Sequence, residues 1–471
     1  MAPKSKINIK KSINIPDSEK NSESNSESNS EFNSDYSMIL SNLPSNTDNI
    51  FGSSYLNDVN FSYNIDYPKY SLGYGYYIHQ TKRGFEKELQ QFVGKKEVFR
   101  TLNPFERYID NSEESIGVLS KKYFDLVFKT KTKKPEILSR AFYKLWEILM
   151  LYDLIDLDNK KFVSAHLAEG PGSFIQATMY YRDMFSKYSK DDKYYAVTLH
   201  QEDEKNHVPA LEKNFVDYYS KETPQRFILH KTYPKQVAGG DKKKDNGDLT
   251  NPKTIKLFGG DMKEKADLIT ADGGFEWTNE NLQEQEAFRL IFGQIVAGIL
   301  NQKKGGHFVI KFFETFTITS VKFMSILRQC YNKVDIVKPL TSRLSNSEKY
   351  LVCMDFKYDN NKEITTKLTE MLKIIHKEQK LKIVNVFSNF KPDEEFLNTI
   401  TKYNIILENQ NYKAINNIVK FIKAQNYYGD TYQMARQMQI NAAKFWINNF
   451  LPSNIDKLDK IKKSLKKIFL I

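Results

Sequence analysis

The stretch that most constrains the fold is residues 162–177, FVSAHLAEGPGSFIQA. It begins with a short, mostly apolar run of the kind that forms a buried parallel strand. The run ends at Glu169, a Gly170-Pro171-Gly172 turn follows, and Ser173 is a suitable N-cap for the helical pattern after it. Such a unit typically opens a nucleotide-binding α/β sheet. Because G-x-G-x-x-G is absent, the turn fits a ligand without a pyrophosphate better than a dinucleotide, and a plain strand–helix corner is the alternative.

Composition sets limits on domain number, partners and compartment. A chain of 471 residues can hold two or three domains. Its 70 Lys and Arg exceed its 58 Asp and Glu, giving a formal charge of +12, which suits a nucleic-acid partner or simply a solvated basic surface. Cys330 and Cys353 lie in apolar runs and resemble buried hydrophobic side chains, which indicates a reducing, intracellular compartment. We expect no membrane span and no signal peptide.

Four regions follow from the pattern along the chain. Residues 1–50 are rich in Ser, Asn and Glu and are predicted to be a disordered tail. Residues 51–135 form a mixed or helical segment, residues 136–358 an α/β domain, and residues 359–471 a Lys-rich helical region. In the last stretch, apolar residues recur at helical spacing with lysines between them, and we expect this helix to dock on the core rather than on a membrane or RNA. These apolar residues are Ile455, Leu458, Ile461, Leu465 and Ile468.

Within the α/β domain, apolar strands alternate with helical segments. The turn at residues 341–347, between the last two predicted strands, is too short for a crossover and suits an antiparallel hairpin. The pattern predicts a doubly wound, mostly parallel sheet with an antiparallel pair at its edge. Residues 200–253 look like a long insertion.

Three predicted strand ends carry unusual side chains, namely Glu169, Asp272 and Lys311. Lys311 lies in an otherwise apolar run, where a lysine is costly to bury unless it is paired or functional, although an edge strand can also carry such a lysine. Asp272 could be only a turn residue, and Glu348 only a solvated strand start. A lysine near carboxylates and a second lysine can be tuned to take a proton from a hydroxyl group. No spacing of His and Cys indicates a metal site, and the sequence has no G-x-S-x-G or Walker motif.

Five motifs in order carry a resemblance to a known family. They are ADGGF at 271–275, ENLQE at 280–284, GGHFVIK at 305–311, KPLTSR at 338–343 and NSEKY at 346–350. Together they resemble FtsJ-type (RrmJ) ribose 2′-O-methyltransferases, and are most similar to the branch that methylates the first transcribed nucleotide of capped mRNA, which includes eukaryotic enzymes and relatives in large DNA viruses. The resemblance covers roughly residues 100–357. It implies a Rossmann-like methyltransferase sheet with an antiparallel last strand, the cofactor S-adenosyl-L-methionine, and an RNA substrate.

The resemblance also implies site residues. The family's Lys-Asp-Lys-Glu tetrad corresponds to Lys144, Asp272, Lys311 and Glu348. Cofactor contacts are implied at Ser139, Ala168, Glu169, Gly170, Pro171, Gly172, Ser173, Phe174, Gly247 and Asp248. RNA contacts are implied at Arg100, Thr101, Asn281, Leu282, Gln283 and Asn346. The chain departs from the family pattern at Glu169, where many relatives have Asp or a small residue, at Ser173, which replaces a third glycine, and at Leu249, which replaces an isoleucine.

Several functions therefore stay open. The first is formation of the cap-1 structure on mRNA, with Lys311 acting on the target 2′-hydroxyl. The second is methylation of ribosomal or other uncapped RNA, and the third is a non-catalytic RNA-binding or structural subunit that retains the fold. Other capping or transcription proteins are candidate partners. The abundance of Asn, Lys, Ile and Tyr is typical of an AT-rich genome, and a virus of the host cytoplasm would fit it.

Overall fold

The computed structural model describes the chain in segments. These are residues 37–39, 49–52, 58–63, 103–105, 123–125, 135–199, 210–230, 245–275, 282–424, 429–452 and 455–469. No helix in these segments is both long and apolar enough to cross a membrane.

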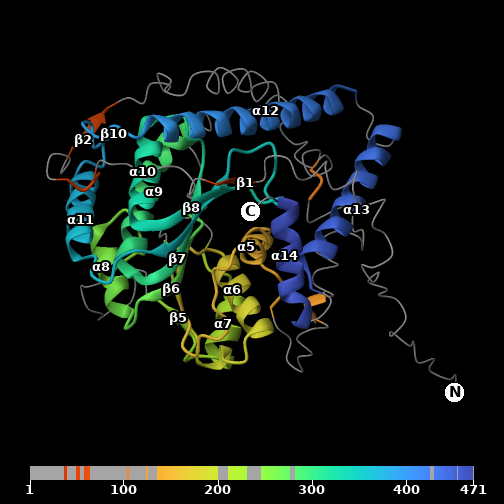
Figure 1. Ribbon diagram of the computed structural model, residues 1–471, viewed down its shortest axis with the longest axis horizontal. Helices are drawn as coiled ribbons and strands as arrows, with labels where there is room; N and C mark the ends of the chain where they lie inside the picture. The colour runs from red at the N-terminus through yellow and green to blue at the C-terminus, as the bar shows by residue number, and fades with distance from the viewer. Residues whose placement is uncertain are drawn as a thin grey trace.

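An eight-stranded sheet organises the structure (Figure 1), with strand order β1-β8-β9-β7-β6-β3-β4-β5. Five neighbouring strands are parallel: β7 (Gln302–Phe312), β6 (Ala266–Ala271), β3 (Val163–Leu167), β4 (Lys193–Val197) and β5 (Phe227–Leu229). The last strand, β9 (Lys349–Phe356), is antiparallel to β7 on one side and to β8 (Tyr331–Val337) on the other. The mostly parallel sheet with an antiparallel last strand is therefore confirmed. The predicted place of the hairpin at the edge was wrong, because β1 (Ser37–Ile39) pairs with β8 outside it.

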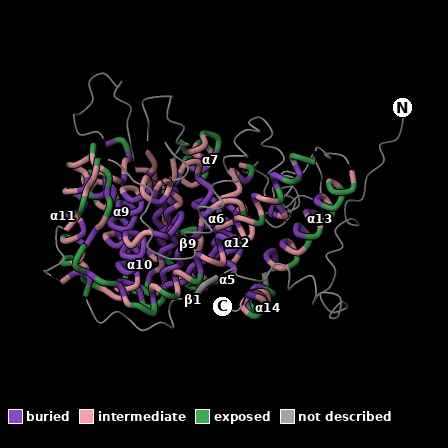
Figure 2. Tube along the Cα trace, turned by 90° about the horizontal axis from the view of Figure 1, so that it is seen from above, coloured by how far each residue is buried: buried purple, intermediate pink, exposed green. Residues whose placement is uncertain are grey.

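Helices cover both faces of the sheet because its buried strands alternate between two hydrophobic clusters. Leu268 and Val309 belong to one cluster, and their neighbours Ile269 and Ile310 belong to the other. The first cluster includes side chains of α5 (Ala141–Leu151), α6 (Ser173–Phe185) and α7 (Lys213–Glu222). The second includes side chains of α8 (Pro252–Asp261), α9 (Gln283–Asn301), α10 (Ile318–Cys330) and α11 (Lys362–Lys377). Figure 2 shows the buried residues concentrated between these layers.

Two segments fold differently from the sequence prediction. The predicted insertion at 200–253 contains α7 and β5, so part of it continues the alternation of helix and strand. The predicted disordered tail at 1–50 contains β1, so that prediction is wrong for Ser37–Ile39. Strand β1 is a short apolar stretch, Ser-Met-Ile, that pairs through its backbone groups, and the polar composition of residues 1–50 as a whole therefore does not reveal it. A second, two-stranded sheet joins β2 (Val59–Ser62) to β10 (Lys382–Val386).

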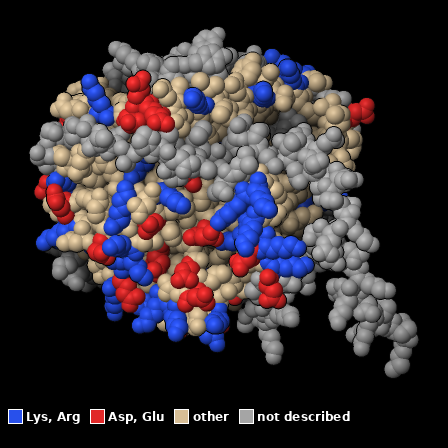
Figure 3. Space-filling model, viewed as in Figure 1, with Lys and Arg blue, Asp and Glu red and all other residues tan. Residues whose placement is uncertain are grey.

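The C-terminal helices pack on the α/β domain. After α12 (Glu394–Ala424) come α13 (Asp430–Phe450) and α14 (Leu458–Phe469). Leu465 and Phe469 of α14 are buried, and Lys462 Nζ donates to Asp153 Oδ1 at 3.0 Å, just after α5. The predicted docking of the last helix on the core is therefore confirmed. Its outer side stays basic, and Figure 3 shows Lys and Arg side chains gathered over α14.

Leu465→Ala tests how much this docking stabilises the protein. The side chain is fully buried, so its truncation removes apolar contacts and leaves a cavity. We expect the free energy of unfolding to fall by about 2–5 kcal/mol, measured by urea denaturation. Lys463→Ala on the exposed side of the same helix is the control and should stay within about 0.5 kcal/mol of the parent. Equal stability of the two variants would contradict a docked α14.

Candidate active site

The glycine-rich turn lies at the carboxyl end of β3, where parallel sheets bind their ligands. Glu169 is buried there, and its Oε1 accepts a hydrogen bond from Ile175 N at 2.8 Å. Its Oε2 is also buried but has no hydrogen-bond partner among the described residues. Burial raises the pKa of Glu169 well above its ordinary value, and the negative charge of Asp272 raises it further. The turn thus presents one polar atom whose partner must come from elsewhere.

The next part of the turn is closely packed. Gly172 has φ +115°, and a Cβ there would lie 3.0 Å from the ring of Phe215 and 3.1 Å from Leu138. Glycine is therefore required both by the backbone conformation and by the space. Ser173 then begins α6, and its Oγ lies 2.7 Å from Ser139 Oγ. Two predicted cofactor contacts that are distant in sequence thus meet beside this turn.

The other predicted cofactor element, Gly247 and Asp248, leads into α8. Asp248 Oδ1 accepts from Thr250 N at 2.9 Å, and Asn251 caps the helix by accepting from Lys253 N at 2.9 Å. The side chain of Asp248 remains only partly buried.

The predicted tetrad forms two lysine–carboxylate pairs. Lys144 on α5 lies 2.7 Å from Glu348 Oε1, just before β9. Lys311 on β7 lies 3.1 Å from Asp272 Oδ1, just after β6, and donates to the Asp272 carbonyl at 2.9 Å. The four side chains keep between 10% and 18% of their exposure. Four elements thus deliver paired charges whose tips can still meet a ligand.

Glu348 joins the two pairs electrostatically. Burial by itself raises the pKa of Glu348, but Lys144 and Lys311 outweigh this and hold it well below the ordinary value. Ser342 Oγ donates to Glu348 Oε1 at 2.8 Å, and Lys338 Nζ donates to the Glu348 carbonyl at 2.8 Å. Glu348 is therefore a carboxylate that orients the amines around it.

Asp272 and Lys311 have their own support. Tyr350 OH donates to Asp272 Oδ1 at 2.9 Å, and Tyr350 stands opposite Lys311 in the β7–β9 ladder. Burial raises the pKa of Tyr350 well above its ordinary value, and Asp272 adds to the shift, so the phenol stays a donor. A side chain at Gly274 would come 3.3 Å from Lys311 Nζ, so glycine keeps this side of the amine open.

A buried carboxylate outside the tetrad holds the loop that carries Glu348. Glu147 of α5 accepts from Leu340 N at 2.7 Å, from Thr341 N at 3.0 Å and from Trp446 Nε1 at 3.0 Å. Burial raises the pKa of Glu147, while its hydrogen bonds with Thr341 and Trp446 oppose that shift. The C-terminal helix α13 therefore supports the loop next to the tetrad.

Sequence analysis did not assign site roles to Glu147, Ser342, Lys338 and Tyr350. Tyr350 follows Glu348 at a spacing of two, which places both side chains on one side of an extended segment, and this spacing could have indicated it. Glu147 is three residues after Lys144, the spacing of neighbours on a helix. Its partners come from distant segments, so the spacing alone identifies no role.

The predicted RNA residues are only partly described. Asn346 lies in the Glu348 loop, and its side-chain oxygen accepts from Lys338 Nζ at 2.9 Å. Leu282 and Gln283 stand at the start of α9. Arg100, Thr101 and Asn281 lie outside the described residues.

Comparison with known proteins agrees with this geometry. Residues 137–356 match the model of the FtsJ-like methyltransferase family. This segment is similar to FtsJ-like methyltransferase domains. It contains the four tetrad residues and both predicted cofactor elements.

Three relatives show how far the similarity extends. A cap-specific mRNA (nucleoside-2′-O-)-methyltransferase 2 of Drosophila melanogaster is 28% identical over 272 residues, 56% of this chain and 36% of its own. A cap-specific methyltransferase 1 of Trypanosoma cruzi is 33% identical over 197 residues, 41% of this chain and 48% of its own. An inactive cap-specific methyltransferase 1B of Caenorhabditis briggsae is 28% identical over 217 residues, 43% of this chain and 25% of its own. The chain thus spans about a quarter to a half of these relatives' lengths.

The cofactor of this FtsJ-like domain is S-adenosylmethionine, and the residues present fit it. Three features lie together at the carboxyl end of β3. They are the Glu169 Oε2 atom without a hydrogen-bond partner among the described residues, the Gly172 position without room for a side chain, and the paired hydroxyl groups of Ser139 and Ser173. Such a ligand carries both amine and hydroxyl donors, which suit buried carboxylate and hydroxyl groups.

A histidine cluster fixes the second predicted cofactor element. His230, at the end of β5, has its Nε2 2.9 Å from Asp245 Oδ2 and its Nδ1 2.5 Å from Asp261 Oδ2. Thr254 Oγ1 donates to Asp245 Oδ1 at 2.5 Å. The cluster therefore links both ends of α8 to the end of β5. Asp245, which belongs to the cluster, is two residues before Gly247. Burial lowers the pKa of His230, but its hydrogen bonds to the two aspartates outweigh this and raise it.

His230→Gln should show a pH-dependent loss of stability. Because the folded pKa lies above the ordinary value of about 6.5, the charged histidine stabilises the fold fully below that pH, and this contribution is lost as pH rises through the folded pKa. We expect the variant to lose about 1–3 kcal/mol of unfolding free energy at pH 6 and clearly less at pH 9. Urea denaturation at both values measures this difference. A difference that does not change with pH would refute the charged cluster.

Proposed function

We propose that the protein is an S-adenosylmethionine-dependent RNA ribose 2′-O-methyltransferase that acts on the first transcribed nucleotide of capped mRNA. The main support for the proposal is one structural observation. Two lysine–carboxylate pairs, Lys144–Glu348 and Lys311–Asp272, lie at the same end of the sheet as the Glu169 turn. The cap-specific names of the relatives support the capped substrate.

The chemistry assigns Lys311 the central role. S-adenosylmethionine supplies an electrophilic methyl group when it is bound. Lys311 Nζ, held by the Asp272 carboxylate and carbonyl, is placed to hydrogen-bond the 2′-oxygen, and in its neutral amine form it can take up the proton of that hydroxyl group. Glu348 and Lys144 fix the charge around this amine. Alignment of the oxygen and a preorganised field supply most of the barrier reduction in such a site.

A non-catalytic subunit is the alternative that the relatives raise, since one of them is described as inactive. Sequence similarity at this level therefore does not decide activity. The geometry favours an enzyme, because all four tetrad side chains are present, paired and partly accessible. A purely structural domain has no need to keep four charged groups at such a cost of burial.

Lys311→Ala should abolish methyl transfer. Removal of the amine takes away the group that positions the hydroxyl and accepts its proton, so we expect the rate to fall about 10²–10⁴-fold or more. The assay follows a labelled methyl group from S-adenosylmethionine to capped RNA. Lys333→Ala, at an exposed position on β8, is the matched control and should keep the parent rate. Full activity of the Lys311 variant would refute its role.

The substrate is tested with matched RNAs. A capped transcript should accept one methyl group at its first nucleotide, and the same transcript with a 2′-deoxyribose there should accept none at that position, because the reacting oxygen is missing. Nucleotide-level analysis of the product gives the position. Equal transfer to an uncapped transcript would replace the cap-specific proposal with a methyltransferase of uncapped RNA.

We also propose that the protein works in a reducing compartment. Cys330 and Cys353 are free and fully buried. Burial raises the pKa of Cys330 to about 12 and that of Cys353 well above its ordinary value, so both thiols act as packing groups.

A further inference from the structure

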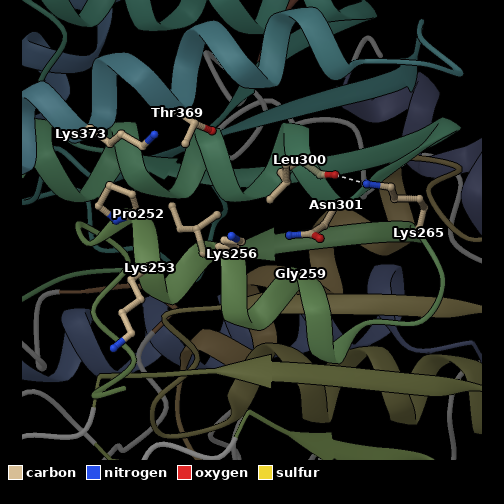
Figure 4. Close-up of a pocket in the computed structure, with 10 residues that line it drawn as sticks. Pro252, Lys253, Lys256, Gly259, Lys265, Leu300, Asn301, Thr369 and Lys373 are labelled. Carbon is tan, nitrogen blue, oxygen red and sulfur yellow. Dashed lines mark hydrogen bonds between the residues drawn. The ribbon is translucent and has the colours of Figure 1, made fainter. Parts of the chain in front are cut away.

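A groove of about 600 Å³ lies between α8, α11 and the C-terminal end of α9 (Figure 4). Its lining contains none of the tetrad residues and none of the predicted cofactor residues. Pro252, Ile255 and Leu300 contribute apolar carbon surface. Four lysines also line it, two from α8, one from the segment before β6 and one from α11: Lys253, Lys256, Lys265 and Lys373.

Among the described residues, these four lysines have no carboxylate partner, unlike three lysines on nearby parts of the chain. Lys303, Lys304 and Lys367 each pair with an aspartate or glutamate at 2.6–2.7 Å. None of the four groove lysines makes an ion pair with any residue that the structure describes. Lys265 instead donates to the Leu300 carbonyl, as Figure 4 shows, and burial lowers its pKa. The groove therefore concentrates uncompensated positive charge over an apolar floor.

The lining also distinguishes between two kinds of anionic ligand. Single-stranded nucleic acid is held by basic groups together with aromatic side chains on which bases stack. Among the described residues that line this groove, none is aromatic. An acidic peptide with aliphatic side chains matches both features, since its carboxylates can pair with the lysines and its apolar side chains can cover Pro252 and Leu300.

We propose that this groove binds an acidic, aliphatic peptide segment of a partner protein. Lys253 and Lys256 come from α8 and Lys373 comes from α11, the two helices that flank the groove in Figure 4, so an extended or helical segment between these helices meets positive charge from both of them. This surface is separate from the methyltransferase site, and the proposal does not depend on which RNA the enzyme modifies.

The test uses the full chain and a fluorescein-labelled synthetic peptide of alternating glutamate and leucine, followed by fluorescence anisotropy. We expect saturable binding that weakens as salt is raised. The double variant Lys256→Glu/Lys373→Glu should weaken binding at least about tenfold, a change of about 1.4 kcal/mol in binding free energy. Lys362→Glu/Lys377→Glu makes the same charge change on α11 outside the groove lining and should bind as the parent does.

Two further arms make the result decisive. A peptide with serine in place of leucine should bind more weakly, because it cannot cover the apolar floor.

A labelled single-stranded RNA is compared in parallel. Loss of RNA binding in the groove variant with unchanged peptide binding would overturn the proposal in favour of an RNA surface. Absence of peptide binding, or equal loss in both double variants, would also overturn it. Retained methyl transfer and an unchanged unfolding midpoint show that each variant is folded.

Discussion

The interaction on which the site depends is the pairing of Lys144 with Glu348. It joins the helix that precedes the first strand of the domain, α5, to the strand that completes the sheet, β9. Each charge is costly to bury by itself, and each becomes tolerable because the other is present. Glu348 also feels Lys311, so the same carboxylate balances both amines. The tetrad is therefore one electrostatic unit, and it exists only when β9 lies beside β7, which places Tyr350 opposite Lys311.

That unit rests on packing well outside the sheet. Glu147 holds the backbone of Leu340 and Thr341, and Trp446 of α13 donates to the same carboxylate. Trp146, which precedes Glu147 on α5, donates its indole N–H to the Phe450 carbonyl at the end of α13. Because α5 also carries Lys144, a shift of α13 would move both sides of the Lys144–Glu348 pair. The C-terminal helices are consequently part of the structure that positions the tetrad, although the family match ends at residue 356.

A feature of this structure can be predicted from the sequence only where the residues that determine it are close together in the chain. Lys311 stands out because a charge inside an apolar run violates local expectation, and such violations often mark functional sites. The alternating strands and helices are equally local, and the parallel sheet followed from them. Strand β5 has three residues and lies in a polar region, so its pairing with β4 is decided by tertiary contact. Glu147 also stands in an apolar run, but its donors, from Leu340 to Trp446, come from distant segments, so its role cannot be predicted from the local sequence.

Helix α8 connects the predicted cofactor element at Gly247 and Asp248 to the basic groove. Its first turn is capped by Asn251, three residues after Asp248, and Thr254 binds Asp245 on the other side of that element. Lys253 and Lys256 of the same helix line the groove. A helix of ten residues moves largely as a rigid body, so its outer surface and its capped end cannot respond independently. The His230 cluster holds both ends of α8 against β5, so the segment at Asp248 and the side of α8 that lines the groove share one rigid support.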